Sequence, residues 1–330
     1  MIGRRAFLDA VVLGGAASLL GARAAIASEP PPESTRIRLV KIPSVCQAPL
    51  YVAEDLLRAE GFTDVQYVEA SATEIYEKLG AGHADFTQFY GVPFIEEIDR
   101  GRPVVILAGV HTGCQQLVAI DGVRSIRDLK GKTIAVTFAS PALSVLITMM
   151  THVGLDHRKD VRFVYHTPAE AVQLLADRKI DAVLTAPPTV QELRAKKIGH
   201  PVLDTTVDRP WSQYFCCMFV GNRDFVRKHP VATKRALRAI LKADQVCALE
   251  PERIARSIVD RGFTKSYEYA LQTMKDVPYG KWRQYSPEDT VRFYALRLRE
   301  AGLIKSAPQK ILADGTDWRF LNELKKELKG

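Results

Sequence analysis

The sequence lacks the short motifs that mark the common classes of enzyme. Its 330 residues contain no G-x-S-x-G nucleophile elbow and no glycine-rich phosphate loop. Gly80 and Gly82 begin a G-x-G pattern, but Asp85 stands in the place of the third glycine, and the pair follows an expected helix instead of a strand. We therefore expect no catalytic activity and no cofactor.

Cysteine is also scarce. Five cysteines are too few for a fold built on disulfides, and their odd number leaves at least one unpaired within the chain. Cys216 and Cys217 are adjacent, so on a strand they point to opposite faces and do not readily share one tetrahedral ion. His111 and Cys114 have a spacing suited to two metal ligands, but no second pair follows at a zinc-like distance. We expect buried thiols and no metal site.

The chain is basic, but it has no concentrated basic block. Its formal net charge is +8, and lysine and arginine are interspersed with aspartate and glutamate. The aromatic-studded basic stretch of a nucleic-acid-binding protein is missing, so we expect no nucleic-acid partner. The positive charge fits either a solvated exterior or attraction of an anionic solute.

The N-terminus has the pattern of a bacterial export signal. Arg4 and Arg5 precede an apolar run at residues 10–20, which is short for a membrane span, and small residues follow at Ala25 and Ala27. This order predicts a cleaved, twin-arginine-type leader. An uncleaved membrane anchor is the alternative.

We place the signal peptide at residues 1–27, with Ser28 as the mature start and a linker at 28–36. Asp9 departs from the twin-arginine pattern, so the general export route stays open. No cysteine near the cleavage region is available for lipid attachment, so the prediction is a periplasmic protein without a lipid anchor.

About 300 mature residues exceed what one hydrophobic core usually holds, so we expect two α/β lobes. Capping-box spacing at Ser71 and Glu74, and again at Thr167 and Glu170, predicts helix starts. Extended segments are expected from residue 37 onward and at 65–68, 85–90, 103–108, 116–120, 132–136, 180–185 and 213–221. The C-terminal part reads as mainly helical, with helices expected at 231–249, 287–301 and 318–328.

Several segments resemble the nitrate, sulfonate and taurine solute-binding family of ABC transporters, which also includes pyrimidine-precursor binders. The similar segments are Ala-Pro-Leu-Tyr-Val-Ala at 48–53, Gly-His-Ala-Asp-Phe at 82–86, Asp-Leu-Lys-Gly-Lys-Thr-Ile-Ala-Val at 128–136, Lys-Ile-Asp-Ala-Val at 179–183 and Asn-Arg-Asp-Phe-Val at 222–226. Their order is more specific than any one motif.

This resemblance implies a type II periplasmic-binding-protein fold, with two α/β lobes joined by a two-strand hinge and a ligand cleft between them. Lobe 1 would comprise residues 37–118 and 215–330, and lobe 2 residues 119–214. The implied function is that of a monomeric, periplasmic substrate-binding component of an importer, with a small-molecule ligand and an inner-membrane ABC permease as partners. The ligand would be a small organic anion, such as a sulfonate, a carboxylate or an aromatic acid, or a pyrimidine-like compound.

Two alternative functions remain open: a partner of a sensor protein, and an enzyme. Ligand-bound lobes can instead present their surface to a sensor. A pyrimidine-precursor synthase of the same fold carries a cysteine-rich run before the strand that ends in Gly-Asn. Here the Cys216–Cys217 pair lies later, inside the expected strand, so the similarity to that active motif fails.

In such a fold the ligand is held where the carboxyl ends of strands meet loops and helix N-termini. The residues expected there, which we predict to bind the ligand, are Gln47, Tyr90, His111, Phe138, Ser140, Pro141, Ala186, Trp211 and Tyr214.

Each of these predictions has a purely structural alternative. Ser140, as a helix N-cap, would present free backbone N–H groups to an anion or would only cap its own helix. The aromatic residues would stack on a planar ligand or pack in the core, Gln47 would bind the ligand or lie on an exposed loop, and His111 would be a buried, satisfied histidine. No arginine falls at an expected strand end; Arg209 is the nearest.

Overall fold

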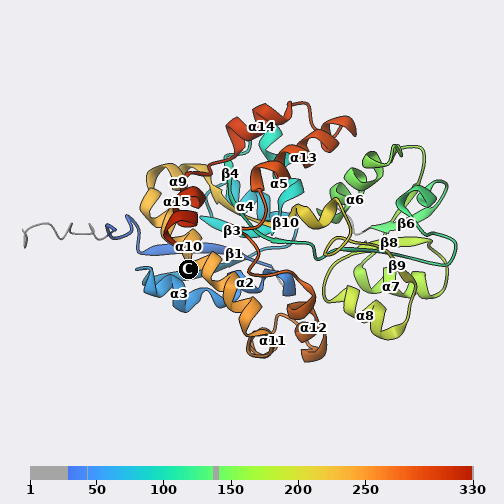
Figure 1. Ribbon diagram of the computed structural model, residues 1–330, viewed down its shortest axis with the longest axis horizontal. Helices are drawn as coiled ribbons and strands as arrows, with labels where there is room; N and C mark the ends of the chain where they lie inside the picture. The colour runs from blue at the N-terminus through green and yellow to red at the C-terminus, as the bar shows by residue number, and fades with distance from the viewer. Residues whose placement is uncertain (1–28, 43, 137–140, 329–330) are drawn as a thin grey trace, which may run out of the picture. The chain divides into compact units, whose positions relative to one another are not determined.

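The computed structural model describes residues 29–42, 44–136 and 141–328 (Figure 1). All of the named helices and strands belong to one compact unit, Pro32–Gly330. The predicted signal peptide lies outside the described residues. Within the described ranges, no helix combines the length and the apolar character needed to cross a membrane.

The first sheet has five strands in the order β2-β1-β3-β10-β4. β1 pairs in parallel with β2 and β3, whereas β10 runs antiparallel between β3 and β4. The strands are β1 (Arg36–Lys41), β2 (Asp64–Glu69), β3 (Phe86–Tyr90), β4 (Val104–Thr112) and β10 (Phe215–Asn222). Every residue of β3 and β4 is buried, as expected for strands covered on both faces.

The second sheet also has five strands, in the order β7-β6-β8-β5-β9. β6 pairs in parallel with β7 and β8, and β5 runs antiparallel between β8 and β9. The strands are β5 (Gln116–Ala119), β6 (Thr133–Val136), β7 (Arg162–Tyr165), β8 (Ala182–Thr185) and β9 (His200–Asp204).

The chain passes between the two sheets twice, once from β4 to β5 and once from β9 to β10. The two α/β sheets confirm the predicted fold class. The expected lobe boundary at 118/119 falls inside β5, whose residues pair in the second sheet from Gln116 onward.

Figure 1 shows α5 and α13 on one side of the first sheet, and α2 and α10 on the other. The helices that follow strands of the first sheet are α2 (Ala48–Val52), α3 (Glu54–Ala59), α4 (Glu74–Gly80), α5 (Gly91–Asp99), α9 (Arg223–Lys228) and α10 (Pro230–Leu249). Those of the second sheet are α6 (Pro141–His152), α7 (Pro168–Ala176) and α8 (Thr189–Lys196). The chain ends with α11 (Pro251–Asp260), α12 (Tyr267–Asp276), α13 (Pro287–Glu300), α14 (Pro308–Gly315) and α15 (Arg319–Glu327). The described residues also form the short 3-10 helices η1 (Val45–Gln47), η2 (Ile126–Leu129) and η3 (Trp211–Gln213).

Local signals explain where several helices begin. The Thr167 hydroxyl accepts a hydrogen bond from the Glu170 backbone N–H at 3.3 Å, and the Glu170 carboxylate accepts one from the Thr167 N–H at 2.8 Å. Ser71 and Glu74 make the same reciprocal pair. The predicted capping box at Thr167 is therefore confirmed, whereas α4 begins later than predicted, at Glu74 with Thr73 as its N-cap, so the Ser71–Glu74 pair lies just before that helix. The strand expected at 103–108 continues to Thr112, because pairing with β10 extends to that residue.

Candidate functional site

The site begins with three neighbouring strands of the first sheet. In the register of the sheet, Cys217 at the start of β10 lies opposite Tyr90 on β3 and opposite His111 on β4. Cross-strand partners point to the same face of a sheet. The antiparallel insertion of β10 therefore brings a thiol, a phenol and an imidazole together at the carboxyl ends of β3 and β4.

The 3-10 helix η1 closes over this face from the end of β1. Its central carbonyl, that of Cys46, accepts hydrogen bonds from Gln88 Nε2 at 3.3 Å and from the Tyr279 hydroxyl at 3.2 Å. His111 Nε2 lies 3.1 Å from the same oxygen. Three polar side chains from separate segments thus converge on one backbone carbonyl.

Gln47, a predicted ligand contact, is buried in this region and is not an exposed loop residue. Its Nε2 donates to the Gln88 carbonyl at 2.7 Å, and its Oε1 accepts from the Tyr51 hydroxyl at 2.7 Å. Gln88 Oε1, by contrast, is buried without a hydrogen-bond partner among the described residues. An unpaired buried acceptor is costly, so Gln88 is a polar group in this region that a ligand would satisfy.

The cysteines are free, and four of the five gather beside these residues. The Sγ atoms of Cys46 and Cys217 lie within 4.8 Å of one another, and Cys114 Sγ lies 3.0 Å from Cys216 Sγ. Hydrogen bonds from Cys114 and Cys217 hold the pKa of Cys46 well below its usual range, although burial opposes this. Burial raises the pKa of the Cys114, Cys216 and Cys217 thiols well above the usual value.

His111 is 1% exposed and has carbonyl groups near both ring nitrogens. Its Nδ1 lies 3.2 Å from the Gly113 oxygen, opposite the Nε2 that faces Cys46. Burial acts to lower the pKa of His111, but its hydrogen bond with Cys46 and the nearby negative charges raise the pKa above its usual value. One of those charges belongs to Asp244 on α10, and burial raises the pKa of that carboxyl to about 7.

A metal-ligand grouping emerges here that the sequence analysis did not predict. The donor atoms of Cys46, His111 and Cys217 all lie within 4.8 Å of one another. These residues come from η1, β4 and β10, so their spacing along the chain carries no zinc-like pattern. Only the register of β10 between β3 and β4 would have disclosed the grouping.

Trp211 and Tyr214 form a second aromatic group at the crossing from β9 to β10. Trp211 is 2% exposed and meets the ring of Phe293 edge-on, at 5.5 Å between centroids. Tyr214 stacks on the same Phe293 ring at 4.1 Å and an interplanar angle of 16°. Their principal described neighbours are on α13, which favours the core-packing alternative for Trp211, whereas Tyr214 is only half-buried.

The remaining predicted residues belong to the second sheet. Pro141 is the first residue of α6, and Ala186, which is half-buried, follows β8. Phe138 and Ser140 lie outside the described residues. Helix α6 contacts α5, which lies on the first sheet (Figure 1).

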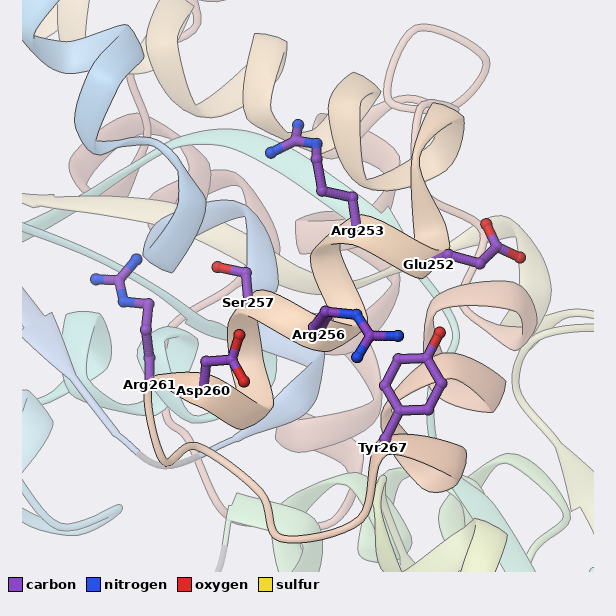
Figure 2. Close-up of a pocket in the computed structure, with 7 residues that line it drawn as sticks. All are labelled: Glu252, Arg253, Arg256, Ser257, Asp260, Arg261 and Tyr267. Carbon is purple, nitrogen blue, oxygen red and sulfur yellow. The ribbon is translucent and has the colours of Figure 1, made fainter.

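A cavity of about 530 Å³ lies away from these strand ends, between α11 and α12 (Figure 2). Charged residues dominate its lining, but they are engaged with one another. Arg256 stacks over the Tyr267 ring at 4.9 Å, Arg253 pairs with Glu250, and Arg261 donates to the Tyr51 carbonyl. This cavity offers few free recognition groups, so the strand ends of the first sheet remain the candidate site.

Known proteins resemble this chain over most of its length. The nitrate/nitrite binding protein NrtA of Nostoc sp. (strain PCC 7120) is 24% identical over 73% of this chain and 61% of its own length. The taurine-binding periplasmic protein of Escherichia coli K12 is 24% identical over 55% of this chain and 57% of its own length. The chain therefore spans about three fifths of the length of these relatives.

The fold has close structural counterparts. The alkanesulfonate-binding protein SsuA from Xanthomonas axonopodis pv. citri, solved with bound MOPS, superposes with a TM-score of 0.69 at 16% identity, covering 87% of this chain and 99% of SsuA. This likeness confirms the periplasmic-binding-protein fold. Residues 30–259 match the NMT1-like family, and the chain belongs to that family.

Proposed function

We propose that this protein is the periplasmic substrate-binding component of an ABC importer for a small organic solute, either an anion or a pyrimidine-like compound. The observation that carries the proposal is the match of residues 30–259 to the NMT1-like family, combined with relatives that are named as binding proteins and with buried polar and aromatic groups at the strand ends. Relatives of the chain bind nitrate and taurine, and a structural counterpart binds alkanesulfonates.

The chemistry of the strand ends favours an organic solute with a planar part. Tyr90, 9% exposed, lies two residues after Gln88 on β3, so the two side chains are on the same face of the sheet, and Gln88 keeps its unpaired acceptor there. Aromatic rings bind planar groups by stacking, and a lone amide oxygen accepts one N–H or O–H. The described groups of this region include no lysine or arginine side chain, so recognition would depend on hydrogen bonds and stacking more than on charge pairing.

The second sheet would supply the opposite wall. We propose the starts of α6 and α8 for this role, with Phe138, Ser140, Pro141 and Ala186 as the contacting residues. The N-terminus of α6 would offer backbone N–H groups to an anionic end of the solute. A ligand that contacts both sheets would favour the arrangement that brings its two sets of contacts together, and a permease could recognise that arrangement.

The test is thermal unfolding of the purified protein in the presence of sulfonates, nitrate, aromatic and aliphatic carboxylates, and pyrimidines. A ligand at a hundredfold excess over its dissociation constant should add about 2.7 kcal/mol to the free energy of unfolding. The expected result is a clear shift with one organic class.

Two variants then locate the binding. Tyr90→Ala should weaken affinity by a few-fold to about tenfold, because it removes one stacking surface. Tyr165→Ala is the matched control, since Tyr165 lies on the edge strand β7 and is 52% exposed. Equal affinity in both variants would refute the proposed site, and no stabilisation by any solute would argue against the binding function.

A further inference from the structure

The cysteines and the histidine of the first sheet form a cluster that solute import does not require. We define the thiol–imidazole cluster as Cys46, His111, Cys114 and Cys217. Its members come from η1, from the end of β4, from the crossing to the second sheet and from the start of β10. Their side chains are between 0% and 3% exposed, so the cluster is sealed within the fold.

We propose that the thiol–imidazole cluster binds one thiophilic metal ion of the Zn²⁺ type. Cys46 Sγ, Cys217 Sγ and a ring nitrogen of His111 already lie within 4.8 Å of one another. Around a tetrahedral zinc ion, with bonds of about 2.3 Å to sulfur and about 2.0 Å to nitrogen, donor atoms stand roughly 3.5–3.8 Å apart. A contraction of about 1 Å, within reach of small side-chain rotations, would complete the geometry.

We assign the fourth position to Cys114. Its Sγ lies 3.0 Å from the Sγ of Cys216, the chain neighbour of Cys217, but it is not one of the three donors that already lie within 4.8 Å of one another, so its side chain would have to rotate towards the ion. Three thiolates and one imidazole are a common ligand set of closed, four-coordinate structural zinc sites. Sulfur ligands also select against Mg²⁺ and Ca²⁺, which prefer oxygen.

The surroundings of His111 support this assignment. The Cys46 carbonyl has two lone pairs and already accepts from Gln88 and Tyr279, so a third donor from His111 Nε2 would overcommit it. If Nδ1 carries the proton and donates to the Gly113 carbonyl, Nε2 can leave the Cys46 carbonyl, which keeps Gln88 and Tyr279 as donors, and turn its lone pair towards the metal. A histidine that ligates a metal usually donates its other N–H to such a carbonyl.

Cys216, which is not a proposed ligand, lies close enough to Cys114 to form a disulfide with it. Its Sγ lies 3.0 Å from Cys114 Sγ, and an oxidant would join the two sulfurs and remove the fourth ligand. The metal must therefore be added to reduced protein. This inference is independent of the proposed solute, because metal binding and solute binding are measured separately.

The experiment is a titration of the full chain with Co²⁺ under anaerobic conditions and with a phosphine reductant. Co²⁺ substitutes for Zn²⁺ and reports its ligands through visible absorption bands and thiolate-to-cobalt charge transfer. We expect saturation at one equivalent, intense charge transfer, and loss of both signals when Zn²⁺ displaces the cobalt.

Cys217→Ala should reduce the charge-transfer intensity and weaken Co²⁺ binding by at least about tenfold. Cys247→Ala is the matched control, because Cys247 on α10 is an equally buried free thiol outside the cluster. The absence of charge transfer in the wild-type protein, or equal effects of the two substitutions, would overturn the proposal.

A measurement on the unaltered chain keeps the test decisive if Cys217→Ala fails to fold. Native mass spectrometry of the reduced wild-type protein with Zn²⁺ should show one bound ion that survives dilution into metal-free buffer. A spectrum with no zinc adduct, or with a statistical spread of several weak adducts, would contradict a single built site.

Discussion

The two sheets have the same topology but differ in what they bury. β1, β2, β3, β4 and β10 of the first sheet correspond in order and direction to β6, β7, β8, β9 and β5 of the second. In each sheet, one antiparallel strand arrives from the other sheet and inserts between two strands that run parallel to one another. Because the topology is shared, the position at the start of β10 in the first sheet is equivalent to the position at the start of β5 in the second.

Different chemistry occupies these positions. In the first sheet Cys217 lies between Tyr90 and His111, whereas in the second Gln116 lies between Thr185 and Asp204. The Gln116 amide donates to the Asp204 carboxylate at 2.5 Å, so that position is closed by its own polar pair. The first sheet keeps free thiols and an unpaired amide oxygen instead, which is why it carries both proposals.

Burial differs as well. β3 and β4 are buried at every residue, whereas β7 has only exposed and half-buried residues and β9 has a single buried residue. A strand covered on both faces holds its side chains in a dry environment, where hydrogen bonds are strong and unpaired groups costly. The first sheet is therefore the more sensitive to substitution.

The largest expected difference comes from the same truncation in both sheets. Phe219→Ala on β10 removes a fully buried ring that stacks on Phe86 at 5.0 Å, and it should cost about 3–5 kcal/mol of unfolding free energy. Phe163→Ala on β7 removes a half-buried ring and should cost about 1–2 kcal/mol. Urea unfolding measures both, and equal losses would contradict the difference in burial.

Asp244, on the α10 helix that covers the first sheet, should make the free energy of unfolding depend on pH. Burial raises its pKa from 3.8 to about 7, so the folded state keeps a proton that the unfolded chain releases. Stability should therefore fall as pH rises from 3.8 towards 7, and the cost should stay constant above that. At about 1.4 kcal/mol per pKa unit, the full cost is at most about 4 kcal/mol.

Asp244→Asn removes this titration, and the amide oxygen can still accept the Gly280 N–H that Asp244 accepts at 2.8 Å. The variant should be more stable than the wild type at pH 8 and indistinguishable from it near pH 3.5. A stability difference that is the same at both pH values would show that Asp244 does not titrate in this range.

The smallest changes in unfolding free energy should come from helix caps, and they should be equal whether the helix belongs to the first or the second sheet. Ser71→Ala before α4 and Thr167→Ala before α7 each remove a hydroxyl that accepts a helix N–H at 3.3 Å. Each should cost about 1 kcal/mol, because capping is local to the first helical turn. Thr167→Ser is the control that keeps the hydroxyl. Clearly unequal losses for the two alanine variants would mean that tertiary packing also depends on the caps.

The sequence was most informative where the physics is local. Pro168 after Thr167 and the continuous apolar run before Ala108 identified a helix start and a buried strand correctly, because caps and hydrophobic runs depend on neighbouring residues. The edge strands β7 and β9 were not predicted, since their mixed burial leaves no clear alternation.

By itself, the sequence determined the family, the alternation of strands and helices, and several of the residues that stand at strand ends. Only the tertiary structure decided which of those residues meet. Cys46 and Cys217 are 171 positions apart, yet the insertion of β10 between β3 and β4 places both beside His111. Strand register between distant segments is set by packing across the whole sheet, and no local pattern encodes it.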